Sequence, residues 1–391
     1  MLAALVLLCG ALGCSGESDE TDPGGAQGPA EAASWPLFHG RQDMTGVAVG
    51  RLPARLALRW KMKTGAAVKS SPVIELAPDD PSGQTGRVFV GSNDRSLYAF
   101  NLSDGKQLWT FQTADAVEAT PLVHEGAVYV GSVDGFVYAL DAATGAMRWK
   151  HETESKILGG ANWTRSPQGD RIWILIGSYD MKMYCLDAAT GKTVWSVETS
   201  NYVNGTPALA DGKVIFGGCD GVIRVLAPVD GRELSTLDAG GYVAGSPLLM
   251  DGRIYAANYE EKFICADVAT GKTVWEYKGE DDGFYSSPAA SGDRLVIGGL
   301  DHKVHCVSRE TGKAIWTFAT RRQVDSSPAI CGNKVVVGSN DGRLYLLSLA
   351  DGKLLWSYEI GRDVASSPAV AGGWVVVGSD DGYVYAFGAK R

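Results

Sequence analysis

SPAICGNKVVVGSNDGRLYLLSLADGKLLW, the stretch from Ser327 to Trp356, decides the fold. A similar stretch, TPLVHEGAVYVGSVDGFVYALDAATGAMRW, runs from Thr120 to Trp149, and further copies recur from Trp60 onward, mostly at intervals of 40 or 41 residues. Self-similarity with a period of this size is the signature of a repeat protein in which each copy is one structural unit. The architecture therefore follows from one copy and from the number of copies.

Each copy contains four short segments of strand character, separated by turns. A Ser-Pro or Thr-Pro pair opens the first segment, and a Gly-containing turn leads to a β-branched run such as Val335–Val337. An Asp-Gly turn, as at Asp134-Gly135, tolerates the positive φ of a tight hairpin and leads to the third segment. A Thr-Gly or Asp-Gly turn then leads to a fourth segment that carries a Trp. Four antiparallel strands per copy, repeated radially, form the blades of a β-propeller.

Two landmarks give the number of blades. The Gly that ends the second strand recurs at Gly91, Gly131, Gly177, Gly217, Gly298, Gly338 and Gly378, with Ala257 at the eighth place. The Trp of the fourth strand recurs at Trp60, Trp109, Trp149, Trp195, Trp275, Trp316 and Trp356, with Leu234 at the place of a missing copy. The landmarks predict an all-β fold, an eight-bladed β-propeller of four-stranded antiparallel blades.

The two chain ends predict how the ring closes. The last copy ends at Arg391 without a Trp strand, whereas the segment around Trp60 has a Trp strand but no preceding partners. We predict that the Trp60 strand joins the last blade, since this pairing closes the ring and hides two strand edges that would otherwise be exposed. Residues 35–391 are then one propeller domain.

The N-terminus predicts export. Residues 1–14, MLAALVLLCGALGC, are apolar but too short to cross a bilayer. The run Ala11–Cys14 resembles a bacterial lipoprotein signal, and this resemblance implies that Cys14 is acylated and becomes the mature N-terminus. A simple secretory signal and an uncleaved anchor are the alternatives. Ser15 after the cysteine favours, by the same resemblance, an outer-membrane lipoprotein facing the periplasm, with the cell surface or secretion as alternatives.

Charge is concentrated next to this signal. The net charge is −9, and residues 15–34 hold five acidic side chains and no Lys or Arg. A segment with so little to bury predicts a disordered acidic tether. The rest of the chain is nearly neutral and shows no basic stripe, which argues against nucleic-acid binding.

The turn before the Trp strand resembles a known family. Residues Ala188–Trp195 read A-x-T-G-K-x-x-W, similar to the pyrroloquinoline-quinone-type propeller repeat, and the resemblance covers nearly all of the chain after residue 34. It implies that the blade tryptophans pack between adjacent blades. It says little about function, because many activities occur on propellers.

Enzymes with this repeat carry features that the sequence lacks. The resemblance implies, for a quinoprotein dehydrogenase, a vicinal disulfide, a calcium ion held by Glu and Asn, and a catalytic Asp. No Cys-Cys pair and no Cys-x-x-Cys-His haem site occur in the chain. We therefore predict no catalytic residues, no metal and no cofactor. The alternative is a quinoprotein dehydrogenase-like or sensory protein that binds pyrroloquinoline quinone (PQQ) with calcium, or another small ligand.

One set of residues is expected at the mouth of the central channel. Positions three before each first-strand Pro lie near the axis in a propeller, and here they are Lys69, Glu118, Asn204, Ala244, Tyr285, Asp325 and Ala365. The loops around them carry aromatic residues that we expect to be exposed: Tyr202, Tyr242, Phe284 and Tyr285. Aromatic side chains on loops held by a rigid scaffold are good partner contacts. Packing beneath the loops is the alternative explanation.

An acid recurs in the turn between the second and third strands. It stands at Asp94, Asp134, Asp180, Asp220, Asp301, Asp341 and Asp381, with Glu260 at the eighth place. Ring closure would arrange these acids on one face, where they could form a weak site for a cation or a basic partner. The alternative is that Asp occurs there for backbone reasons, since it favours such turns.

The whole chain is also similar to the lipoprotein propeller of the outer-membrane β-barrel assembly machinery. The similarity rests on the lipidated cysteine, the acidic tether, the eight blades and the lack of an active site. It implies a monomeric, non-catalytic scaffold that binds periplasmic or outer-membrane proteins while a lipid holds it on the membrane. In that protein a loop rich in Leu and Arg and an acidic loop grip the partner. The corresponding connections here, 198–206 and 237–246, are short and are not rich in those residues.

Overall fold

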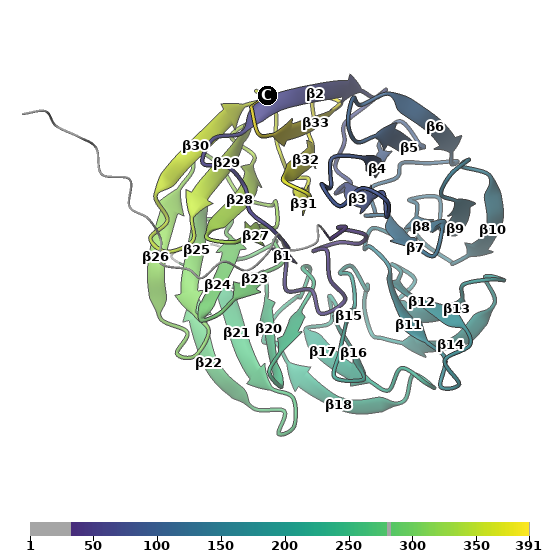
Figure 1. Ribbon diagram of the computed structural model, residues 1–391. Helices are drawn as coiled ribbons and strands as arrows, with labels where there is room; N and C mark the ends of the chain where they lie inside the picture. Colours follow the sequence, from purple (N-terminus) through teal and green to yellow (C-terminus); the bar gives the residue numbers. More distant parts are fainter. Residues whose placement is uncertain (1–32, 280–282, 391) are drawn as a thin grey trace, which may run out of the picture. The chain divides into compact units, whose positions relative to one another are not determined.

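The computed structural model describes residues 33–279 and 283–390, and the fold is all-β. Eight sheets are arranged radially around a central axis, as Figure 1 shows. The predicted eight-bladed propeller is therefore confirmed. Within the described part of the chain, no helix has the length and hydropathy needed to cross a bilayer. Cys14 and most of the predicted tether lie outside the described residues.

The first four blades follow one another along the chain. Blade 1 contains β3 (Val73–Leu76), β4 (Gly86–Ser92), β5 (Ser96–Asn101) and β6 (Gln107–Gln112). Blade 2 contains β7 (Leu122–His124), β8 (Ala127–Gly131), β9 (Phe136–Asp141) and β10 (Met147–Glu152). Blade 3 contains β11 (Asn162–Arg165), β12 (Ile172–Gly177), β13 (Lys182–Asp187) and β14 (Thr193–Glu198). Blade 4 contains β15 (Ala208–Ala210), β16 (Lys213–Gly217), β17 (Val222–Leu226) and β18 (Glu233–Asp238).

The last four blades complete the ring. Blade 5 contains β19 (Leu248–Met250), β20 (Arg253–Ala257), β21 (Lys262–Asp267) and β22 (Thr273–Lys278). Blade 6 contains β23 (Ala289–Ser291), β24 (Arg294–Gly298), β25 (Lys303–Ser308) and β26 (Ala314–Ala319). Blade 7 contains β27 (Ala329–Cys331), β28 (Lys334–Ser339), β29 (Arg343–Ser348) and β30 (Leu354–Glu359), with β1 (Val47–Ala48) added. Blade 8 contains β31 (Ala369–Ala371), β32 (Trp374–Gly378), β33 (Tyr383–Gly388) and β2 (Ala57–Lys63).

The ring closes as predicted. β2, near the start of the chain, pairs antiparallel with β33 at its end, and Trp60 lies opposite Ala386 in this ladder. The amide of Thr64 also donates to the carbonyl of Gly382 at 2.7 Å. Blade 8 is thus built from both ends of the propeller domain, and β2 supplies its outermost strand.

The tryptophans lock neighbouring blades together. The ring of Trp109 lies on the turn at Gly145 of the next blade, where a Cβ would be only 2.7 Å from the ring and φ is +74°. The indole N–H of Trp109 donates to the carbonyl of Ala142 at 3.1 Å. Trp60, Trp149, Trp195, Trp275 and Trp316 repeat both contacts with the following blade. The Thr-Gly and Asp-Gly turns therefore need glycine because the indole occupies the place of a side chain.

Two blade junctions differ from this pattern. Leu234 stands where the lock between blades 4 and 5 would be, and the turn at Gly271 has no ring over it. Trp356 faces blade 8, which has no turn of this kind, and packs edge-on against Phe387 with 5.6 Å between ring centroids. The predicted interblade position therefore holds for all seven tryptophans, with a different contact for the last.

A belt of hydroxyl groups joins the inner strands. In most Ser-Pro and Thr-Pro pairs the hydroxyl accepts a backbone N–H from the preceding blade, as in Thr206 N–H to Ser246 Oγ at 2.8 Å. The same bond recurs around the ring and crosses the seam, where Ser367 N–H donates to Ser71 Oγ at 3.0 Å. The Ser-Pro and Thr-Pro pairs thus satisfy buried backbone donors as well as opening strands.

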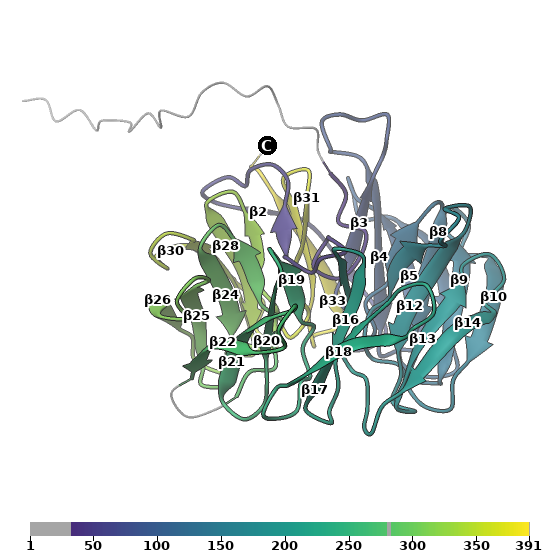
Figure 2. The same cartoon turned by 90° about the horizontal axis from the view of Figure 1, so that it is seen from below.

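A segment that the repeat does not predict lies across the axis. Residues 35–48, called the plug below, run along the inner strands of blades 1 to 7 (Figures 1 and 2). Their backbone and side-chain bonds reach Ile74, Val123, Trp163, Leu209, Leu249, Ala290 and Ile330 in turn. The plug ends as β1, which pairs parallel with β27. One end of the channel is thereby closed.

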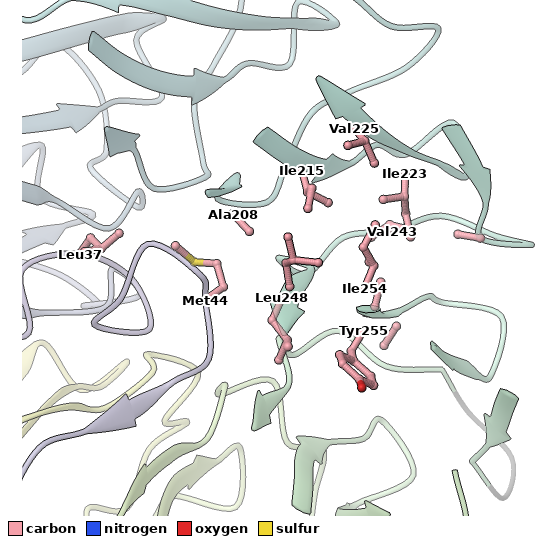
Figure 3. Packing of buried hydrophobic residues seen from close by; sticks show 14 of the residues in the cluster. Leu37, Met44, Ala208, Ile215, Ile223, Val225, Val243, Leu248, Ile254 and Tyr255 are labelled. Carbon is pink, nitrogen blue, oxygen red and sulfur yellow. The ribbon is translucent and has the colours of Figure 1, made fainter. Parts of the chain in front are cut away.

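The plug belongs to the hydrophobic core. Leu37 and Met44 are 2% and 0% exposed and pack with buried residues of blades 2 to 6. Figure 3 shows Met44 next to Ala208 and Leu248 of the inner strands, with Leu37 on its other side. The channel of this propeller is therefore filled with apolar side chains on one side and is open only on the other.

One buried histidine of the plug predicts a pH effect. His39 Nδ1 bonds the carbonyl of Met44 at 3.1 Å, Nε2 has no partner, and burial lowers the pKa of His39 to about 4. A histidine that stays neutral in the folded state but titrates normally when unfolded stabilises the protein above pH 6.5 and loses this effect as the pH falls toward 4. We expect roughly 2–3 kcal/mol of loss between pH 7.5 and pH 4.5.

His39→Asn is the variant that tests this effect. Asn tolerates the left-handed φ of +58° at position 39 and keeps a donor for Met44, but it does not titrate. Urea midpoints at the two pH values should therefore differ less for His39→Asn than for the natural protein. Since the carboxylates are common to both, an identical pH dependence would contradict the role assigned to His39.

Candidate functional site

The open end of the channel is a cavity of about 660 Å³ on the propeller axis. All eight blades contribute to its wall through the connections that lead into their inner strands. Phe38 of the plug also lines the cavity, opposite the open mouth. The cavity, called the funnel below, is therefore a blind recess.

Sequence reasoning placed one ring of the funnel correctly. Every residue expected three positions before a first-strand Pro lies in the wall, namely Lys69, Glu118, Asn204, Ala244, Tyr285, Asp325 and Ala365. In blade 3, where Gly160-Ala161 stands in place of the Ser-Pro or Thr-Pro pair, Leu158 takes this position. The register of the repeat is thus enough to identify residues that face the axis.

The aromatic residues expected on the loops divide into two groups. Tyr202 is 44% exposed, Tyr242 54% and Tyr285 38%, as expected for contact residues at the mouth. The prediction for Phe284 was wrong, because its side chain is 1% exposed and packs against Phe263, Tyr277 and His305. Neighbouring loop residues point to opposite sides, so Phe284 faces the core where Tyr285 faces the funnel.

A second ring was missed by the sequence analysis. It consists of the residue two places after each landmark Gly, and Tyr259, Leu300, Asn340 and Asp380 of this set line the funnel. Tyr179 of the same set donates its hydroxyl to Asn204 Oδ1 at 3.2 Å. The repeat register could have identified this ring too, since the landmark Gly positions it just as the Pro positions the first.

The funnel has an aromatic side formed by blades 3 to 6. Tyr179 and Tyr202 stack with centroids 4.5 Å apart, and the rings of Tyr259 and Tyr285 lie 5.6 Å apart. Lys156 places its ammonium 4.6 Å from the centroid of Tyr179. Burial raises the pKa of Tyr179 to about 12, so that its hydroxyl stays protonated in the neutral range.

The other side of the funnel, formed by blades 7, 8, 1 and 2, is acidic. Its wall holds four carboxylates, Glu118, Asp325, Asp363 and Asp380, while Lys69 is the one cationic residue among the described residues that line the cavity. Arg322 forms an ion pair with Asp363 at 2.7 Å. Burial raises the pKa of Asp325 and of Asp380. The two sides therefore offer different chemistry to one ligand.

The recurring turn acids have a structural role. Tyr98, Tyr138, Tyr184, Tyr345 and Tyr385 each donate a phenol O–H to the Asp four residues earlier, for example Tyr138 to Asp134 at 2.8 Å. Asp134 also accepts the backbone N–H of Ala114 from the connection that leads into blade 2. Asp220 and Asp301 bond Arg224 and His305 in place of Tyr. These contacts agree with the alternative that Asp recurs in these turns because it stabilises the local backbone and side chains.

Neither a metal cluster nor a disulfide is found in the described residues. No group of three His, Cys, Asp or Glu side chains there is placed to hold a metal ion, and Cys185, Cys219, Cys265, Cys306 and Cys331 are free thiols. Cys185, Cys265 and Cys306 are buried opposite the blade tryptophans Trp195, Trp275 and Trp316. Burial raises the pKa of Cys265 to about 11, as expected for a packing residue.

Solved structures share this fold. BamB from Moraxella catarrhalis is 21% identical with a TM-score of 0.70, covering 86% of this chain and 100% of that chain. The quinohemoprotein alcohol dehydrogenase from Comamonas testosteroni is 15% identical with a TM-score of 0.75, covering 93% of this chain and 82% of that one. The computationally designed Ika8 protein is 17% identical with a TM-score of 0.72, covering 88% and 99%. At these identities the likeness is one of fold alone.

Comparisons of the sequence identify a curated relative and the family of the chain. A curated relative, the beta-alanine-activating enzyme of Danio rerio, is 35% identical over 94 residues, which are 24% of this chain and 7% of that enzyme. The chain thus spans only a small part of that relative. The family described as outer membrane protein assembly factor BamB matches residues 53–167, 134–241, 219–301 and 300–391, which together cover the repeats from blade 1 to blade 8. The chain belongs to this BamB family of propellers.

Proposed function

We propose that the protein is a non-catalytic scaffold of the bacterial cell envelope that binds other proteins at the mouth of the funnel during outer-membrane protein assembly. Membership of the BamB family supports a protein-interaction role. The observation that carries the proposal is the set of exposed tyrosines on the connections that lead into the inner strands, Tyr202, Tyr242 and Tyr285, of which Tyr285 lines the funnel; this set is called the rim below. Tyrosines on a rigid scaffold contribute large contact area at a low entropy cost, which makes them typical anchors of protein interfaces.

Two of the rim tyrosines lie on the connections that correspond to the partner-binding loops of the similar assembly lipoprotein. The connections between β14 and β15 and between β18 and β19 lack the Leu, Arg and acidic residues that grip the partner there. In this chain they present Tyr202 and Tyr242 instead. A partner held here would therefore contact aromatic side chains, so that the shared architecture is used with different contact residues.

The first described residues lie on the closed face of the propeller. Ser34 accepts the backbone N–H of Leu76 at 3.0 Å, and Trp35 pairs with Ile74, so the chain enters the propeller on the closed face. The long hairpin between β3 and β4 rises from the same face in Figure 2. A lipid anchor attached before residue 33 would thus leave the mouth of the funnel free for a periplasmic partner.

The double variant Tyr202→Ala, Tyr242→Ala tests the role of the rim. Loss of two exposed anchors at about 1–2 kcal/mol each should lower recovery of crosslinked envelope proteins from native membranes at least tenfold. The matched control is Leu108→Ala, Leu354→Ala, which removes two exposed apolar side chains from the outer strands β6 and β30. Equal recovery with the rim variant, or an equal loss with the control, would contradict a docking role for the rim.

The quinone alternative meets an electrostatic obstacle. PQQ carries several carboxylate groups, whereas the described wall of the funnel has four carboxylates against Lys69. Like charges brought close together in a recess partly screened from water repel each other. We therefore expect no change in melting temperature and no dye reduction when PQQ and calcium chloride are added. A saturable rise in melting temperature would instead assign the funnel to a quinone.

A further inference from the structure

Two Asn–carboxylate pairs stand on the acidic side of the funnel. Asn340 Nδ2 donates to Asp325 Oδ2 at 2.7 Å, and Asn93 Nδ2 donates to Glu118 Oε1 at 2.8 Å. An ionised carboxylate only accepts hydrogen bonds, so each pair fixes which end of the amide faces its partner. The amide oxygen is therefore the atom left over in both pairs.

These left-over oxygens are buried and unpaired. Asn340 lines the funnel, its side chain is only 7% exposed, and its Oδ1 has no hydrogen-bond partner. Oδ1 of Asn93, Asp325 and Asp380 is likewise buried and without a hydrogen-bond partner, and of these three residues Asp325 and Asp380 line the funnel. Buried acceptors are nearly always satisfied in folded proteins, so these oxygens call for donors that the described part of the chain does not itself supply.

A cationic group complements these oxygens best. The four oxygens are all acceptors, and two of them belong to carboxylates, so a ligand that complements them offers several N–H groups and a positive charge. Lys69 is exposed, and Arg322 is already engaged by Asp363, so the described cations nearby do not fill this need. Guanidinium and ammonium groups meet both requirements.

The tyrosines that line the funnel and the plug that closes its inner end restrict which cationic ligands fit. Tyr259 and Tyr285 line the same funnel, and an aromatic ring can also attract a cation. The volume of about 660 Å³ is far larger than one ion needs and falls in the range of sites for small molecules or a few residues. Because the plug blocks passage, a polypeptide can enter only by a loop tip or a chain end.

We propose that the funnel binds a Lys- or Arg-bearing loop tip or chain end of a partner polypeptide. The cationic group lies against Asp325, Asn340 and Asp380, and the flanking backbone and apolar atoms lie on the tyrosine side. This inference rests on the proposed scaffold function and names the chemistry that the partner presents. The acidic side then recognises the cationic side chain of the partner, and the tyrosines of the rim add contact area whatever the partner's sequence.

The test is calorimetric titration of the folded protein with a short peptide. The probe is acetylated and amidated Gly-Arg-Gly-Tyr-Gly, and its matched control carries citrulline, the neutral isostere of arginine. We expect binding of the arginine peptide at low salt, at least tenfold weaker binding of the citrulline peptide, and weakening by added salt. Citrulline binding as tight as arginine binding would overturn the proposal.

Matched variants locate the site. Asp325→Asn removes the charge but keeps an oxygen for Asn340, and we expect it to weaken the arginine peptide about tenfold while the melting curve stays close to that of the natural protein. Asp79→Asn removes an equal charge from the exposed hairpin on the closed face and should leave binding unchanged. An equal effect of both variants, or calcium binding lost in Asp325→Asn without any peptide binding, would overturn the proposal.

A pull-down separates this inference from the scaffold role. If Asp325→Asn leaves partner recovery unchanged while the Tyr202→Ala, Tyr242→Ala variant abolishes it, the cationic-tip inference fails and the scaffold role stands. If neither variant lowers recovery, both fail. Loss of recovery with Asp325→Asn but not with Asp79→Asn supports both.

Discussion

Removal of the plug is expected to lower the free energy of unfolding by at least about 5 kcal/mol. The deletion takes away Trp35, Leu37 and Met44, which are 3%, 2% and 0% exposed. It also removes backbone partners from the inner strands of most blades, which leaves buried donors unsatisfied. Chemical denaturation followed by tryptophan fluorescence measures the loss.

A milder variant keeps the prediction testable if the deletion fails to fold. Met44→Ala should cost about 2–5 kcal/mol, because the side chain is fully buried among residues of several blades. The control is Val49→Ala, just beyond the plug, where the side chain is 38% exposed and should cost less than about 1 kcal/mol. If Met44→Ala and the control are equally stable, the plug is not part of the core.

Trp109→Ala is expected to have the second largest effect, a loss of about 3–5 kcal/mol. The indole is 8% exposed, covers the turn at Gly145 and donates to Ala142 of the next blade. Its removal opens a cavity between two blades and leaves a carbonyl without its donor. The measurement is again the free energy of unfolding in urea, with the melting temperature as a second readout.

The chain supplies its own control for the interblade lock. Leu234 occupies the corresponding position between blades 4 and 5, is 42% exposed and does not cover the glycine turn at Gly271. Leu234→Ala should therefore cost less than about 1 kcal/mol. A cost at Leu234 equal to that at Trp109 would show that burial at this position, and not the indole–glycine contact, stabilises the junction.

The repeat made most of the fold predictable. Turn residues and the spacing of Gly and Trp define four strands per blade, and the unequal chain ends require that β2 joins β33. The Pro register also identified the axial residues Lys69, Glu118 and Asp325, because equivalent positions in a radial repeat occupy equivalent places. Family membership agrees with this outcome.

The features that the sequence did not predict are those that the repeat does not encode. The plug bonds to strands that are up to nearly 300 residues away in the chain, as when Gly46 accepts from Ile330, and nothing periodic marks those contacts. The buried position of Phe284 depends on which way one loop turns. The division of the funnel into a tyrosine side and an acidic side arises only when blades far apart in sequence face one another across the axis.

Site-specific photocrosslinking tests the central claim most directly. A benzophenone amino acid is placed at Tyr202 or Tyr242 on the rim and, as controls, at Leu108 or Met147 on the outer strands β6 and β10. Irradiation of intact cells followed by purification then shows which positions touch a partner. The proposed function predicts protein adducts from the rim positions and few from the outer strands. Adducts from the outer strands alone would contradict it, since the partner would then bind the blade edges and leave the funnel unused.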